Sequence, residues 1–187
     1  MSLPNPLYSA ITIIGVAVSW VVLFNLNGAL FAELEFSERA HWIFLPAAFR
    51  ILFVLLFRQI GAIGLIVGAF FTLPHGAASP FLHELFLSIS SGLAPLIAVA
   101  FATRFMGIEI DLQGLRGIQI IVLSFACAIV NSLIVNFYLI LALEPNPPLM
   151  QVASIFVGDV LGAAILLIVI ATSLILVERF RSARIRS

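Results

Sequence analysis

Two charged residues, Arg50 and Asp159, interrupt long apolar stretches of this sequence. A charge placed in hydrocarbon costs about 2.5–3.5 kcal/mol on insertion scales, so such a residue persists where it is paired or faces a water-filled cavity. Arg50 lies nine residues after His41, and Asp159 lies ten residues after Leu149, where the apolar stretches begin. At 1.5 Å per helical residue, each charge falls roughly 12–15 Å past the start of its helix. We therefore predict that Arg50 and Asp159 pair, directly or through a ligand or water, in the outer half of a helical bundle.

Uncharged polar side chains are expected at a similar depth and are taken as supporting residues of the same site. They are Asn25, Asn27, Ser88, Ser91, Asn131 and Asn136. Together with the two charges they indicate a ligand-binding cavity that opens to the cell exterior or periplasm. Structural interpretations stay open, because such groups also join membrane helices through hydrogen bonds worth about 0.6 kcal/mol on average. A buried Arg–Asp pair can likewise be purely architectural.

The composition explains why these positions must lie within a membrane. The chain has 187 residues, of which 63% are hydrophobic and 10% are charged, against about 25% charged in ordinary soluble domains. So little polar surface cannot cover a soluble globule of this size. The length leaves no room for an attached kinase or cyclase domain. The sequence holds no catalytic triad, phosphate loop or recognised metal spacing, so we expect no enzyme activity, cofactor, metal site or nucleic-acid partner.

Six apolar stretches predict an all-α bundle of about six transmembrane helices, because one crossing needs about 20 apolar residues. They cover 7–31, 41–57, 60–73, 85–105, 117–143 and 149–177. The second and third are short, and only Arg58 and Gln59 separate them. They form either two minimal crossings or a re-entrant helical hairpin. Both interpretations return the chain to the same face of the membrane.

The arginines predict the orientation of this single membrane domain. Seven of the nine arginines fall in the turn at Arg58, in the loop with Arg104 and Arg116, or in the basic tail 178–187. Because basic loops stay in the cytoplasm, we expect both termini there and a multi-pass protein of the plasma (inner) membrane. The tail would contact anionic membrane lipid.

Two glycine pairs, each spaced four residues apart, predict close helix packing. They are Gly64 with Gly68 and Gly158 with Gly162. Small residues at this spacing let the backbones of membrane helices approach each other.

Two segments resemble a known family. The segments HWIFLPAAFRILFVLLFRQIGAIGLIVGAFFT and FVGDVLGAAILL resemble motifs of bacterial membrane-associated sensor domains of the first MASE type, and Asp159 matches that family's aspartate. This chain departs from the pattern with Ala48 where glycine is usual and Arg50 where the family is apolar. No segment of the 187 residues resembles the family's output domains. The resemblance implies a stand-alone sensing or ligand-binding module that acts through a separate signalling partner.

Two alternatives stay open beside a sensor. The size and helix count are similar to those of the substrate-binding components of energy-coupling-factor transporters, which bind small molecules from outside and join a separate transport protein. The chain could also be an assembly subunit without a ligand.

Overall fold

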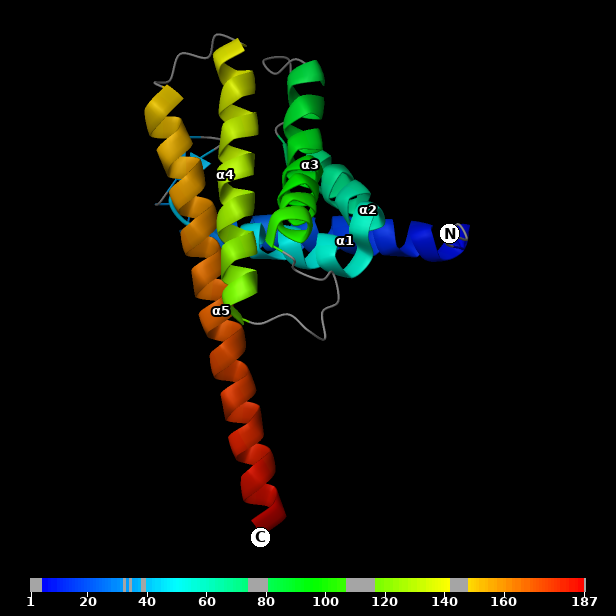
Figure 1. Cartoon of the computed structure of the whole chain (residues 1–187), viewed down its shortest axis with the longest axis vertical. Coiled ribbons are helices and arrows are strands. Elements are labelled where there is room, and N and C mark those ends of the chain that lie inside the picture. The colour runs from blue at the N-terminus through cyan, green and yellow to red at the C-terminus, as the bar shows by residue number, and fades with distance from the viewer. Residues whose placement is uncertain are drawn as a thin grey trace.

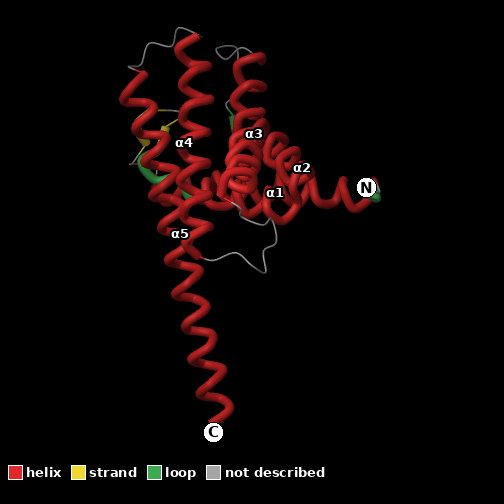
Figure 2. Tube along the Cα trace, viewed as in Figure 1, coloured by secondary structure: helices red, strands yellow, loops and turns green. Residues whose placement is uncertain are grey.

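The computed structural model describes residues 5–31, 33, 35–37, 40–73, 81–106, 117–141 and 148–186. Within these residues the chain forms five α-helices and one short two-stranded ribbon, so the all-α expectation is confirmed (Figures 1 and 2). The helices are α1 (Pro6–Phe31), α2 (Pro46–Thr72), α3 (Phe81–Met106), α4 (Gly117–Leu141) and α5 (Pro148–Arg186). The ribbon pairs β1 (Glu35–Ser37) with β2 (Ala40–His41) in antiparallel fashion. Residues 142–143 of the predicted fifth span lie outside the described part.

Proline sets the starts of three helices. Pro6, Pro46 and Pro148 open α1, α2 and α5. Proline suits this position because its fixed φ matches the helix and the first N–H groups have no helical partner. At the start of α1, the side chain of Asn5 replaces the missing partner by accepting a hydrogen bond from the Leu7 N–H at 3.0 Å.

The predicted second and third spans form one element, α2, which is broken at Arg58. Arg58 has φ 52° and ψ −127°, and it is the one described non-glycine residue with positive φ. Beyond the break Gly61 packs so closely on Phe53 that a Cβ at Gly61 would overlap the Phe53 carbonyl. This contact requires the chain to fold back. The two parts, 46–57 and 59–72, rise only about 18 and 21 Å, less than the roughly 30 Å of a hydrocarbon core.

The second and third predicted spans thus correspond to the two parts of α2, and the break between them lies at the predicted position. The predicted second span also begins too early. His41 belongs to β2 and the α2 helix starts at Pro46.

The helices lie in two directions. Figure 1 shows α3, α4 and α5 side by side and alternating in direction, while α1 runs across them. The first part of α2 runs along α1, and the second part of α2 turns upward beside α3. Gly64 and Gly68 make the packing of α2 on α1 possible, because a Cβ at Gly64 would lie 2.6 Å from the Val16 Cβ, and one at Gly68 would lie 2.8 Å from the Ala17 carbonyl oxygen. The predicted close packing at this glycine pair is confirmed.

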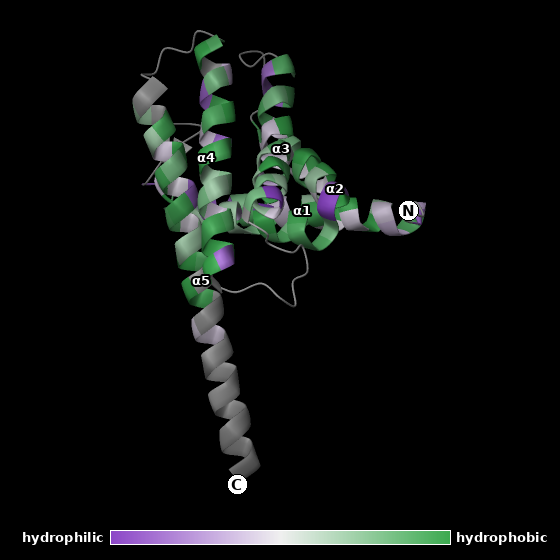
Figure 3. Cartoon of the chain, viewed as in Figure 1, coloured by the Kyte–Doolittle hydropathy of each residue, from purple (hydrophilic) through white to green (hydrophobic). Residues whose placement is uncertain are grey.

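The distribution of polarity is inverted relative to a soluble protein. Large hydrophobic side chains such as Phe71, Leu82 and Phe105 are exposed, whereas Arg50 and Asp159 are buried. Figure 3 shows hydrophobic residues over most of the coloured helix surface. By total length and composition four helices are candidate membrane spans, namely those over Pro6–Phe31, Pro46–Thr72, Phe81–Phe105 and Ile118–Tyr138. Of these, Pro46–Thr72 is the element broken at Arg58. The chain therefore has the surface of a membrane protein.

Helix α5 is longer than a membrane crossing requires. Its 39 residues rise about 58 Å at 1.5 Å per residue. Figure 1 shows its C-terminal part projecting well beyond the other helices. The segment 178–186, expected as a basic tail, continues this helix.

Candidate functional site

Arg50 and Asp159 form the ion pair that the sequence predicts. Nη1 of Arg50 in α2 donates to Oδ2 of Asp159 in α5 at 3.0 Å. The two residues are 6% and 4% exposed. An uncompensated charge at such burial would cost several kcal/mol, so each charge stabilises the other.

Asn131 of α4 donates a second hydrogen bond to the aspartate. Its Nδ2 donates to the same Oδ2 of Asp159 at 2.8 Å. This oxygen therefore accepts hydrogen bonds from two helices while it is carried by a third. The predicted role of Asn131 as a supporting residue of the charged pair agrees with this contact.

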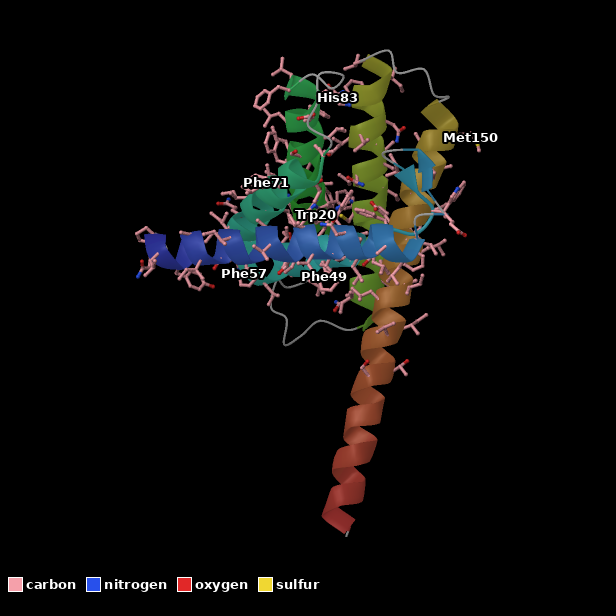
Figure 4. All side chains as sticks on the ribbon, turned by 180° about the vertical axis from the view of Figure 1, so that it is seen from behind. Trp20, Phe49, Phe57, Phe71, His83 and Met150 are labelled. Atoms are coloured by element: carbon pink, nitrogen blue, oxygen red, sulfur yellow. The ribbon has the colours of Figure 1, made fainter. Side chains whose placement is uncertain are left out.

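Two aromatic rings flank the guanidinium group. The Cζ atom of Arg50 lies 5.3 Å from the ring centroid of Trp20 and 5.0 Å from that of Phe44. The two rings meet edge to face at 5.9 Å. Both distances to Cζ are within the range of cation–π attraction, which strengthens where the cation is desolvated. Figure 4 shows Trp20 about midway along α1, and its Nε1–H donates to Thr72 Oγ1 at 3.2 Å.

The backbone segment before α2 is held from two sides, and this fixes Phe44. The side chain of Asn27 donates to the Ile43 carbonyl at 3.2 Å and accepts from the Leu45 N–H at 2.8 Å. On the other side, the Phe44 N–H donates to the Gly158 carbonyl at 3.0 Å. Asn27 therefore acts on the backbone and does not line the site, which corrects its predicted role.

The second glycine pair accommodates this segment and not a neighbouring helix. A Cβ at Gly162 would overlap the carbonyl of Phe44, and Gly158 accepts the hydrogen bond from the same residue. The expected close approach is present, but its partner is the non-helical segment that precedes α2. This packing brings the Phe44 ring to Arg50.

A cavity of about 120 Å³ adjoins the ion pair. By this measure one water molecule needs roughly 10–15 Å³, so there is room for several waters or a small ligand. The cavity lies between all five helices and is lined by Trp20, Phe24, Phe44, Arg50, Ala69, Thr72, Leu73, Leu87, Ser90, Ser91, Asn131, Val135, Ile155 and Asp159.

The guanidinium group has hydrogen-bonding capacity left over. A guanidinium carries five N–H donors, and Nη1 to Asp159 is the hydrogen bond that the Arg50 side chain makes within the described residues. Its buried Nε has no hydrogen-bond partner there. Spare donors beside a cavity can bind an oxygen atom of a ligand or of water.

Besides Asn27, three further predicted supporting residues do not reach the cavity. Asn25 is exposed and donates to its own helix at the Val21 carbonyl at 2.8 Å. Ser88 and Asn136 are buried, but they donate to the carbonyls of Glu84 and Ser132 at 2.7 Å. At about 100° per residue, Asn25 points away from the face that Asn27 occupies.

Ser91 does line the cavity, as predicted, and its neighbour Ser90 joins it. Ser91 also precedes Pro95 by four residues, and Pro95 lies inside α3. Because proline has no N–H, the helical hydrogen bond to the Ser91 carbonyl is lost at this level. Trp20, Phe24, Phe44 and Thr72 were not predicted as site residues. For Trp20 the signal was present, since an indole deep in an apolar helix needs a partner for its N–H.

No protein-family model, curated protein or solved structure matches this chain.

Proposed function

We propose that this protein is a multi-pass inner-membrane protein that binds a small ligand in the cavity beside Arg50 and Asp159. The observation that carries the proposal is the ion pair itself, which adjoins open space while the guanidinium keeps unused donors. Replacement of a buried ion pair by apolar residues is often neutral or stabilising, so helix packing alone gives little reason to retain one. A polar ligand that binds inside the bundle would supply a reason to retain the buried ion pair.

The orientation proposed for the membrane follows from the basic residues. Arg104 lies near the end of α3, and Figure 1 shows that end together with the start of α4 and the C-terminal end of α5 on the same side of the bundle. The positive-inside rule makes this side cytoplasmic. We propose that α2 is a re-entrant hairpin, because neither of its parts is long enough for a crossing, and that the C-terminus is cytoplasmic. Labelling of single cysteines at the two ends with a membrane-impermeant maleimide, in a Cys127→Ala background, tests this topology.

A sensing role is supported by the position of Asp159 on α5. The same helix contacts the ligand cavity, holds the Phe44 segment through Gly158, and continues to Arg186. A ligand that alters the Arg50–Asp159 contact would therefore shift α5 relative to α2. A shift of this kind can be read by a separate signalling protein at the cytoplasmic end.

The test is the small-molecule content of gently purified protein, measured by native mass spectrometry. We expect a ligand to be retained by the wild type and lost from Arg50→Gln, while Asn25→Ala, whose side chain is outside the cavity, retains it. Absence of any small molecule from all preparations, with no binding from a metabolite library, would contradict the proposal. Co-purifying proteins then separate the roles, since a signalling enzyme indicates a sensor and an ATPase indicates a transporter component.

A further inference from the structure

The charges around the cavity sum to zero. Among its lining residues Arg50 from α2 carries the positive charge and Asp159 from α5 carries the negative one. No titratable residue of α1 or α3 lines the cavity in the described part of the chain. On α4 the buried thiol of Cys127 lies within electrostatic range of both charges. Any charged ligand that enters must disturb this balance in a medium of low dielectric constant.

The unused donors determine which charge can enter. Carboxylates accept guanidinium N–H groups in pairs, and this bidentate geometry is the strongest form of the contact. Arg50 meets Asp159 through one nitrogen only, and its Nε is without a partner in the described part. The site can therefore accept an oxyanion at the guanidinium, whereas a cation would meet Arg50 itself. The rings of Trp20, Phe24 and Phe44 provide an apolar wall for the remainder of the ligand.

A second carboxylate beside Asp159 would be unfavourable unless one of the two is neutral. Two neighbouring carboxylates disfavour each other's ionised form. If a proton from water binds Asp159 as the ligand enters, the positive charge of Arg50 is balanced by the ligand and the total remains zero. Asn131 can serve both states, because its amide group donates to an ionised carboxylate and, after rotation, accepts from a protonated one.

We infer that the cavity binds a small carboxylate together with one proton, the carboxylate at Arg50 and the proton at Asp159. This inference rests on the proposed function and specifies its ligand class. The binding step forms one covalent bond, the O–H bond at Asp159. Its proton is transferred from a hydronium ion of the solvent, whose O–H bond breaks to leave water.

The test compares benzoate with its neutral isostere benzamide on full-length protein in lipid nanodiscs, by calorimetry across a pH series. For the wild type we expect the Kd for benzoate to rise about tenfold per pH unit in the alkaline range, because one proton is taken up per ligand. The Kd for benzamide should not change with pH. In Asp159→Asn, which resembles the protonated state, benzoate should bind with no pH dependence. Arg50→Gln should lose benzoate, and Asn25→Ala should match the wild type.

The outcomes separate the two proposals. Binding of benzamide without benzoate, or pH-independent binding of benzoate to the wild type, would overturn the carboxylate–proton inference and leave the ligand site standing. Absence of any ligand from the cavity would overturn the proposed function. Laurate carries the same headgroup from the lipid phase, so competition between laurate and benzoate would support the chemistry and identify lipid as its source. Thermal unfolding of each variant verifies that losses of binding are not losses of fold.

Discussion

Arg50 and Asp159 are 109 positions apart in the sequence, and their side chains meet at 3.0 Å in the interior of the bundle. The contact joins α2 to α5, and Asn131 extends it to α4. Three helices are thus joined at one carboxylate oxygen. The pair therefore affects both the stability of the bundle and the binding of a ligand. Different variants can separate these two effects.

Removal of one member of the pair should destabilise the protein strongly. Arg50→Met and Asp159→Leu each leave the opposite charge buried, which typically costs about 3–5 kcal/mol. The double variant Arg50→Met/Asp159→Leu should recover most of that loss because no charge remains. Thermal unfolding in nanodiscs measures the three variants, with Asn25→Ala as the matched control. A double variant as unstable as the sum of its single variants would show that the two charges do not interact.

The two members of the ion pair could be predicted from the sequence, because a charge in an apolar stretch must find a partner. The break in α2 was also visible, since Arg58 and Gln59 are a polar pair between apolar runs. The faces of the helices were not predictable. In lipid the outer surface is as apolar as the interior, so no amphipathic pattern distinguishes Asn25, which is exposed, from Asn27, which is buried.

The contribution of Phe44 could not be predicted for a different reason. Phe44 precedes α2 in a non-helical segment, and its position depends on Asn27 and Gly158, which are distant in sequence. The spacing of the glycine pair on α5 is the same whether the packing partner is a helix or a non-helical segment. The position of Phe44 is therefore set by tertiary contacts, which the local sequence does not indicate.

Asn27 should prove more important to stability than Asn25, although both lie near the end of α1. Asn27→Ala removes two hydrogen bonds to backbone groups of Ile43 and Leu45, which then lose their partner. We expect a loss of about 1–3 kcal/mol and a weaker affinity for the ligand, because the Phe44 ring is released from Arg50. Asn25→Ala should change stability by less than about 0.5 kcal/mol, as exposed substitutions usually do. Equal effects of the two variants on unfolding temperature would contradict this assignment.

Gly162 should tolerate no side chain. Gly162→Ala places a Cβ against the Phe44 backbone, and we expect a loss of about 1–3 kcal/mol from the forced displacement. Gly15→Ala is the matched control, because a Cβ there meets no atom within 4 Å. That control should be neutral or stabilising by about 0.5–1 kcal/mol, as glycine is unfavourable inside a helix. Melting curves of the two variants, measured side by side, check the difference, and an unchanged Gly162→Ala protein would refute the packing of this segment on α5.

Arg58 should be replaceable by glycine with a gain in stability. Its φ of 52° and ψ of −127° resemble the first central position of a type II′ turn, which glycine occupies without strain. A non-glycine residue in such a region costs on the order of 1–3 kcal/mol, so Arg58→Gly should raise the unfolding temperature. Arg58→Ala keeps the strained backbone conformation, so it should not raise the unfolding temperature. If both variants unfold at the same temperature, the chain does not turn back at this residue.

The most direct test of the ligand site is native mass spectrometry of the folded double variant Arg50→Met/Asp159→Leu beside the wild type. The account predicts that the wild type retains a small molecule and that the double variant, though folded, retains none. Retention of the same molecule by both proteins would show that the ion pair only holds the helices together, and would contradict the assignment of the cavity beside it as the binding site.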